Sequence, residues 1–260
     1  MLRAIAAGLL AGLVSAGAFA HKFPDLSCRA FSGKFVQLAT KGGRQFEVYR
    51  TGPPSARIGL LLLPGKAGLD QHTLAWADRV GAQGYRVLTM GLGSKHKDGS
   101  APIHAHGRSV ARERAALHYL SAPGRKLVTF GWGRAGALQS IQASAADPSD
   151  VSGTVLCNGG VSAKSALLRK LKSKVLLIAF QKTTPLENLQ HFETRMRIYG
   201  KPLIVHYYNI DPEAANPTGR HFDSAIAQEV WGQARLFFRQ IAFLCRRCAP
   251  YPRLLFGYRR

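Results

Sequence analysis

Short apolar runs alternate with segments of helical periodicity along most of the chain. The apolar runs lie at Phe35–Leu38, Phe46–Tyr49, Ile58–Leu63, Tyr85–Met90, Leu127–Phe130, Gly153–Leu156, Val175–Phe180 and Leu203–Tyr208. The helical segments lie at Thr73–Ala82, Ser109–Leu120, Ala135–Ala145, Ala163–Leu171, Leu186–Ile198 and Ser224–Phe243. Apolar strands separated by helices indicate a parallel sheet covered on both faces. We therefore predict an α/β fold with a mostly parallel sheet of about eight strands.

The length and composition of the chain favour one folded domain. It has 260 residues, 46% of them hydrophobic, which is enough for one large core. Residues 1–20 have the pattern of a signal peptide: Arg3, an apolar stretch from residue 4 to 14, and small residues at Ala18 and Ala20. We expect a periplasmic or secreted protein with a domain over residues 21–250 and a basic aromatic tail over 251–260.

The chain is strongly basic, with a formal net charge of +22. A field of that sign concentrates anions near the surface. The basic residues are scattered along the sequence and do not form one stripe, so a specific nucleic-acid site is not indicated. A solvated surface adapted to acid explains the charge most simply, and weak contact with an anionic membrane or polymer stays open.

The cysteines indicate disulfides if the protein is exported. The candidates are Cys28, Cys245 and Cys248, and either the last two pair with each other or Cys28 pairs with one of them. A redox role for Cys245-x-x-Cys248 is an alternative, because neighbouring arginines lower a thiol pKa. That motif follows a helical segment and does not open one after a strand, which disfavours the redox role.

Three glycines lie at the boundary between one predicted strand and the helix after it. Gly131, Gly133 and Gly136 lie between the run ending at Phe130 and the helical segment from Ala135. This pattern is typical of the nucleophile elbow of α/β-hydrolases, in which Gly-x-nucleophile-x-Gly forms a tight strand-to-helix turn. Here Gly133 occupies the nucleophile position and Ala135 the last glycine position. The turn is predicted without its reactive atom.

The same glycines also match the dinucleotide fingerprint Gly-x-Gly-x-x-Gly. That site needs an acidic residue at the end of the next strand, where this chain has Cys157 and Asn158. Histidines at 96, 104 and 106 share one loop, but no cysteine or carboxylate cluster accompanies them at a metal-ligand spacing. We therefore expect no cofactor and no metal.

The order of these segments resembles the dienelactone hydrolase family of α/β-hydrolases. The resemblance rests on a predicted hairpin of Phe35–Leu38 and Phe46–Tyr49 around Gly42-Gly43, on LLLPGKAGLDQHTLAWADRVGAQGYRVLTMGL, on GWGRAG and on GRHFDSAIAQEVWGQARLFFRQ. It covers residues 33–243. It implies an α/β-hydrolase fold and a triad of Cys or Ser, Asp and His. The nucleophile maps to Gly133 and the base to His221. The acid should follow Val175–Phe180, where residues 181–185 contain no carboxylate, so Asp211 and Glu187 are the candidate substitutes.

The resemblance also locates an anion site. The oxyanion region of the family corresponds to Lys66, Ala67, Trp132, Arg134 and Ala135, where backbone N–H groups at a helix start bind an oxyanion without any nucleophile. We expect a degenerate enzyme that keeps a small anionic ligand. One alternative is an active ester or lactone hydrolase with a relocated nucleophile or a water activated by His221. Ser162 and Cys157 lie near the end of the next strand, but no Gly-x-Ser-x-Gly or Gly-x-Cys-x-Gly pattern occurs in the sequence. Another is a basic scaffold for a polyanion or a membrane surface.

Overall fold

The structure is a computed structural model that describes residues 31–64, 68–91, 106–159, 164–216 and 221–243, with only the backbone of 106–109. Several expectations fall outside these residues: the signal peptide, the basic tail, Lys66, Ala67, Cys28, Cys245, Cys248, His96, His104 and Ser162. Within the described part of the chain, none of the helices has both the length and the apolar character needed to cross a membrane.

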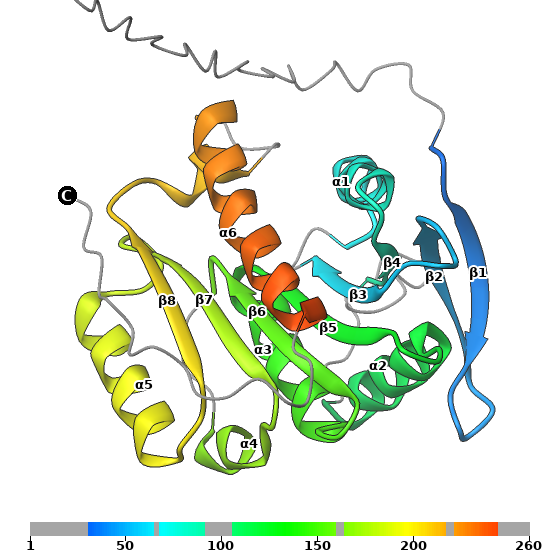
Figure 1. The fold of residues 1–260 in the computed structure, drawn as a ribbon, viewed down its shortest axis with the longest axis horizontal. Helices are drawn as coiled ribbons and strands as arrows, with labels where there is room; N and C mark the ends of the chain where they lie inside the picture. Colours follow the sequence, from blue (N-terminus) through cyan, green and yellow to red (C-terminus); the bar gives the residue numbers. More distant parts are fainter. Residues whose placement is uncertain (1–30, 65–67, 92–105, 160–163, 217–220, 244–260) are drawn as a thin grey trace, which may run out of the picture.

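Eight strands form one sheet in the order β1-β2-β4-β3-β5-β6-β7-β8 (Figure 1). They are β1 Lys34–Ala39, β2 Gln45–Thr51, β3 Ile58–Pro64, β4 Arg86–Thr89, β5 Lys126–Trp132, β6 Val151–Cys157, β7 Lys174–Phe180 and β8 Leu203–Tyr208. β1 and β2 are an antiparallel hairpin, and β2 also runs antiparallel to β4. Every other neighbouring pair is parallel. The predicted mostly parallel sheet of eight strands is confirmed.

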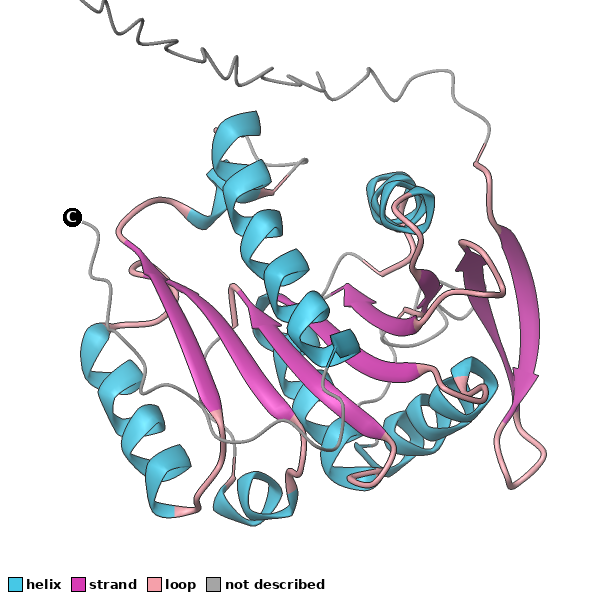
Figure 2. Cartoon of the chain, viewed as in Figure 1, coloured by secondary structure: helices cyan, strands magenta, loops and turns pink. Residues whose placement is uncertain are grey.

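Helices cover both faces of this sheet (Figure 2). They are α1 Gln71–Ala82, α2 His106–Leu120, α3 Gly133–Ala146, α4 Ser165–Lys170, α5 Leu186–Ile198 and α6 Ser224–Phe243, with a short 3-10 helix η1 at Pro212–Ala215. α1 and α6 share a core with one face of the sheet. α2, α3, α4 and α5 pack on the other face. Because β3 is central and covered on both sides, all of its residues are buried, which explains its unbroken apolar sequence.

The sequence pattern placed the start of α3 too late and missed the 3-10 helix η1. α3 begins at Gly133, two residues before the predicted start at Ala135, because the turn before it is tighter than the periodicity suggests. η1 follows Asp211, whose side chain accepts a hydrogen bond from the backbone N–H of Glu213 and caps the turn. One turn of helix is too short to give a periodic signal.

A chain of buried hydroxyl groups joins α3 to the sheet. Ser144 on α3 lies 2.9 Å from the hydroxyl oxygen of Thr129 on β5 and accepts a hydrogen bond of 2.7 Å from Thr154 on β6. Ser140 donates to Thr129, and Thr154 also bonds to Ser173 at 2.7 Å. All five residues are buried. Because each hydroxyl satisfies another, these polar groups are tolerated in the core.

Ser144 is the middle member of this row of hydroxyl groups, so its replacement should destabilise the protein. Ser144→Ala leaves the hydroxyls of Thr129 and Thr154 each without one partner, which should lower the free energy of unfolding by about 1–3 kcal/mol. Urea unfolding followed by circular dichroism measures the loss. Ser149→Ala, at an exposed position after α3, is the matched control and should change stability by less than about 0.5 kcal/mol. Equal stability of the two variants would contradict the role assigned to the hydroxyl chain.

Candidate active site at the turn between β5 and α3

β5 passes into α3 without an intervening loop. β5 ends at Trp132 and α3 begins at Gly133, which has a φ of +67°. This is the left-handed region, which residues with a side chain enter only at a cost of about 1–2 kcal/mol. A Cβ built on Gly133 would meet no atom of the described residues outside its own turn within 4 Å. Position 133 therefore has the backbone strain and the open space of a nucleophile position, and no side chain occupies it.

The turn is kept tight by a close contact of main chain with main chain. A Cβ on Gly131 would lie 2.1 Å from the carbonyl oxygen of Gly136 in the first turn of α3. Real Cβ atoms essentially never approach another atom that closely. The end of β5 thus packs directly against α3 only because residue 131 is glycine.

Aromatic side chains lie beside the turn. Trp132, which precedes Gly133, has its ring centroid 5.9 Å from that of Trp76 on α1. Trp76 also lies 5.1 Å from Phe130 and 6.0 Å from Trp231 on α6. The three tryptophans of the sequence therefore form one cluster next to the candidate site. Sequence analysis missed this cluster because its members come from three distant segments.

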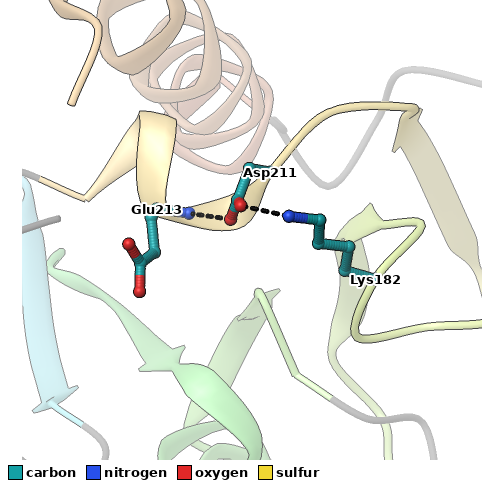
Figure 3. Close-up of polar contacts among 3 residues, drawn as sticks. All are labelled: Lys182, Asp211 and Glu213. Atoms are coloured by element: carbon teal, nitrogen blue, oxygen red, sulfur yellow. Dashed lines mark hydrogen bonds and ion pairs between the residues drawn. The ribbon is translucent and has the colours of Figure 1, made fainter. Parts of the chain in front are cut away.

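The loop after β7, where the catalytic acid was expected, contributes a cation. Lys182 donates a hydrogen bond from its ammonium group to the carboxylate of Asp211, in the loop after β8 (Figure 3). The next residue, Thr183, donates to the side-chain oxygen of Asn158 at 2.9 Å, and Thr184 donates to the carbonyl oxygen of Gly159 at 3.2 Å. These contacts fix the loop at the end of the sheet.

Asp211 and His221, two of the residues singled out in the sequence, lie within electrostatic reach of each other. The hydrogen bond from Lys182 holds the pKa of Asp211 below its ordinary value, helped by the backbone N–H of Glu213 and by the charge of His221. Asp211 already accepts from Lys182 and from Glu213, and His221 is exposed. Asp211 therefore interacts mainly with Lys182, and its interaction with His221 is secondary.

The other predicted site residues lie apart from this pair or are inaccessible. Glu187 is exposed in the first turn of α5, and it forms no hydrogen bond or ion pair with any residue that the structure describes. Arg134 is exposed and Ala135 is half-buried at the start of α3. Cys157 is fully buried, and burial raises the pKa of its thiol well above the ordinary value. This burial disfavours Cys157 as a relocated nucleophile, because the thiolate is the reactive form.

The described residues offer no obvious metal or nucleotide site. They contain no group of three or more His, Cys, Asp or Glu side chains that could hold a metal ion. β6, the strand after the turn, ends at Cys157 and Asn158 and supplies no carboxylate for a ribose. The described groups near the turn are the start of α3 and the charged side chains of the neighbouring loops.

Comparisons with solved structures identify the fold. No protein-family model matches the sequence, and no curated protein matches it. A protein assigned as a dienelactone hydrolase from Klebsiella pneumoniae subsp. pneumoniae has a TM-score of 0.62 and 14% identity, over 80% of this chain and 99% of its own. A dienelactone hydrolase-like promiscuous phosphotriesterase from metagenomic libraries has a TM-score of 0.62 and 18% identity, over 80% and 98%. Brefeldin A esterase, a bacterial protein, has a TM-score of 0.64 and 14% identity, over 85% and 81%. The chain has the α/β-hydrolase fold.

Substitutions at the two glycines of the turn should have unequal effects. Gly133→Ala introduces a Cβ into open space and adds only left-handed strain, so it should cost about 1–2 kcal/mol. Gly131→Ala places the same methyl group 2.1 Å from a carbonyl oxygen and should cost at least about 3 kcal/mol or prevent folding. Chemical denaturation of both variants checks the order. A Gly133→Ala protein that is the less stable of the two would contradict the geometry.

Proposed function

We propose that this protein is an exported, dienelactone-hydrolase-like protein that has lost hydrolysis and binds a small anionic ligand at the vacant elbow. The observation that carries the proposal is the left-handed Gly133 with open space beside it. A turn of this geometry places a nucleophile in an α/β-hydrolase. With glycine there, no hydroxyl or thiol stands at the position from which acyl transfer begins.

The remaining triad positions support the loss of catalysis. His221 has no nucleophile at position 133 to deprotonate. The loop after β7, where the acid was expected, carries Lys182 and no carboxylate. In a catalytic triad the nucleophile, base and acid act as a unit, and removing the nucleophile alone costs about 10⁶-fold in kcat in a serine protease. A histidine that faces solvent without these partners is a poor candidate for an efficient base.

The start of α3 supports anion binding. α3 has 14 residues, and its N-cap residue Trp132 makes no side-chain capping hydrogen bond. The first N–H groups of a helix that lack partners carry partial positive charge and bind carboxylate or phosphate oxygens. The absence of a side chain at Gly133 leaves the approach to these groups open, and Arg134 adds a cation.

Export is supported by the pattern of residues 1–20, with one positive charge, an apolar stretch and small residues before His21. A periplasmic or secreted location also fits the strongly basic composition. The ligand would then be an anion of the medium or cell envelope, and ester or lactone compounds are the natural probes for residual hydrolysis.

The first test is enzymatic. Steady-state hydrolysis of an aryl ester and of an enol lactone by the purified protein should be no faster than by His221→Ala, because the histidine has nothing to activate. Circular dichroism of both proteins controls for folding. Turnover that His221→Ala abolishes would overturn the proposed loss of catalysis and point to a relocated nucleophile or an activated water.

The second test is ligand binding. Titration with acetate, succinate and inorganic phosphate at constant ionic strength should change the tryptophan fluorescence, since Trp132 adjoins the start of α3. Arg134→Gln should weaken binding by about tenfold, the value of one charge-assisted hydrogen bond. Arg197→Gln, which removes the same charge from an exposed position on α5, is the matched control and should bind like the original protein. No saturable change with any of the three anions would contradict the anion site.

A further inference from the structure

Three arginines lie at the end of the sheet opposite the elbow, where the parallel strands begin. Arg50 lies near the end of the antiparallel strand β2, Arg86 is the first residue of β4, and Arg125 immediately precedes β5. The registers align these positions, because Arg50 pairs with Leu88 of β4 and Arg86 pairs with Gly59 of β3. The parallel strands begin at this end of the sheet, whereas the candidate active site lies where they finish.

The three side chains share the face of the sheet that α2 covers. Val48 and Leu88, two positions away from Arg50 and Arg86 respectively, belong to the core under α2, and strand residues two apart point to the same face. Arg125 reaches this face as well, since a Cβ on Gly59 would lie 3.0 Å from its Cδ. All three arginines are half-buried.

Arg125 is held firmly by main-chain carbonyls. Its Nε donates to the oxygen of Ala56 at 2.9 Å, and its Nη1 donates to the oxygen of Leu120, at the end of α2, at 2.6 Å. Its Nη2 donates to the oxygen of Pro54. The guanidinium is thereby fixed in one position before any ligand arrives, so less conformational freedom is lost on binding.

The other two arginines have spare donors. Arg50 donates from Nη1 to the hydroxyl oxygen of Tyr119 on α2, and Arg86 donates from Nη1 to the carbonyl oxygen of Gly52. A guanidinium has five N–H donors in a fixed fork, so each keeps most of its own. Neither they nor Arg125 forms an ion pair with a carboxylate in the described ranges of the chain.

The three positive charges also act on one another. Burial lowers the pKa of Arg86, and the charges of Arg50 and Arg125 lower it further, while Tyr119 acts in the opposite direction. Like charges brought together in partly buried positions repel each other unless an anion lies among them. A tetrahedral oxyanion supplies this compensation and accepts several N–H bonds at once.

We propose that Arg50, Arg86 and Arg125 form a second anion site, which takes a phosphate-type oxyanion. The anion sits at the start of the parallel strands and receives N–H bonds from the guanidiniums, while the hydroxyl of Tyr119 has a proton to donate. The phosphate is either free or the head group of a lipid. The site is independent of the vacant elbow and of the proposed function, because it lies at the other end of the sheet.

The deciding experiment is thermal unfolding of the purified protein in inorganic phosphate and in chloride at the same pH and ionic strength. A ligand that binds only the folded state raises the melting temperature. The original protein and the control Arg197→Gln should both be stabilised by phosphate. Arg50→Gln and Arg86→Gln should each gain less than the control, because the contribution of this site is lost, and calorimetry should show phosphate affinity at this site at least about tenfold weaker in each.

Arg50→Gln is the decisive variant, because the hydrogen bond that its side chain makes within the described part of the chain, to the hydroxyl of the exposed Tyr119, matters little for folding. Equal phosphate stabilisation of Arg50→Gln, Arg86→Gln and the control would overturn the site. The elbow is followed separately through the tryptophan fluorescence in an acetate titration, which Arg50→Gln should leave unchanged, so failure of one anion site is distinguishable from failure of the other.

Co-sedimentation with phosphatidylglycerol vesicles and with neutral phosphatidylcholine vesicles identifies the source of the phosphate. Sedimentation with the anionic vesicles that Arg50→Gln abolishes supports a lipid head group. Phosphate binding in solution without sedimentation supports a free ion.

Discussion

The contact between the end of β5 and the first turn of α3 is the constraint on which the candidate site depends. Main chain meets main chain there, so residue 131 must lack a Cβ, and the chain must then turn through a left-handed residue at 133. β5 lies between β3 and β6 in the middle of the sheet, and the buried hydroxyls of Thr129 and Thr154 join the same helix to two strands. The packing of β5 against α3 therefore sets the position of residue 133. Glycine at that position relieves the strain that a Ser or Cys would store there.

The electrostatics of the site differ from those of a catalytic triad. The acid of a triad must be free to orient the histidine. Here the loop after β7 carries Lys182, which pairs with the carboxylate of Asp211. The result is a charged pair beside an exposed histidine, instead of a carboxylate that holds the histidine in one tautomer. Acidic residues are scarce in this chain, 14 against 36 Lys and Arg, so a carboxylate that pairs with a lysine is not readily replaced.

The sequence predicted the fold well because its signals are local. Alternating apolar runs and helical segments located the eight strands and six α-helices of the described ranges, since a strand buried on both faces, such as β3, must be apolar throughout. The glycines at 131 and 133 indicated a tight turn because no other residue fits both positions without cost. The contacts between residues of the site were harder to predict from the sequence. Lys182 with Asp211, and Trp76 with Trp132, are each distant in sequence, and only the folded sheet brings them together. The arginines at 50, 86 and 125 looked like scattered charge for the same reason.

The grouping of these three arginines in the fold changes the interpretation of the high positive charge. A uniformly solvated basic surface keeps its arginines apart, because like charges repel over a Debye length of about 8 Å. The fold instead aligns Arg86 with Gly59, at the end of the sheet where Arg125 packs, and places Arg50 on the neighbouring strand. Three carbonyl oxygens hold Arg125, so it stays beside the others despite the repulsion. A cluster that the main chain enforces, in a part of the structure where no carboxylate pairs with it, is better explained by an anion at that end of the sheet than by the general basicity of the chain.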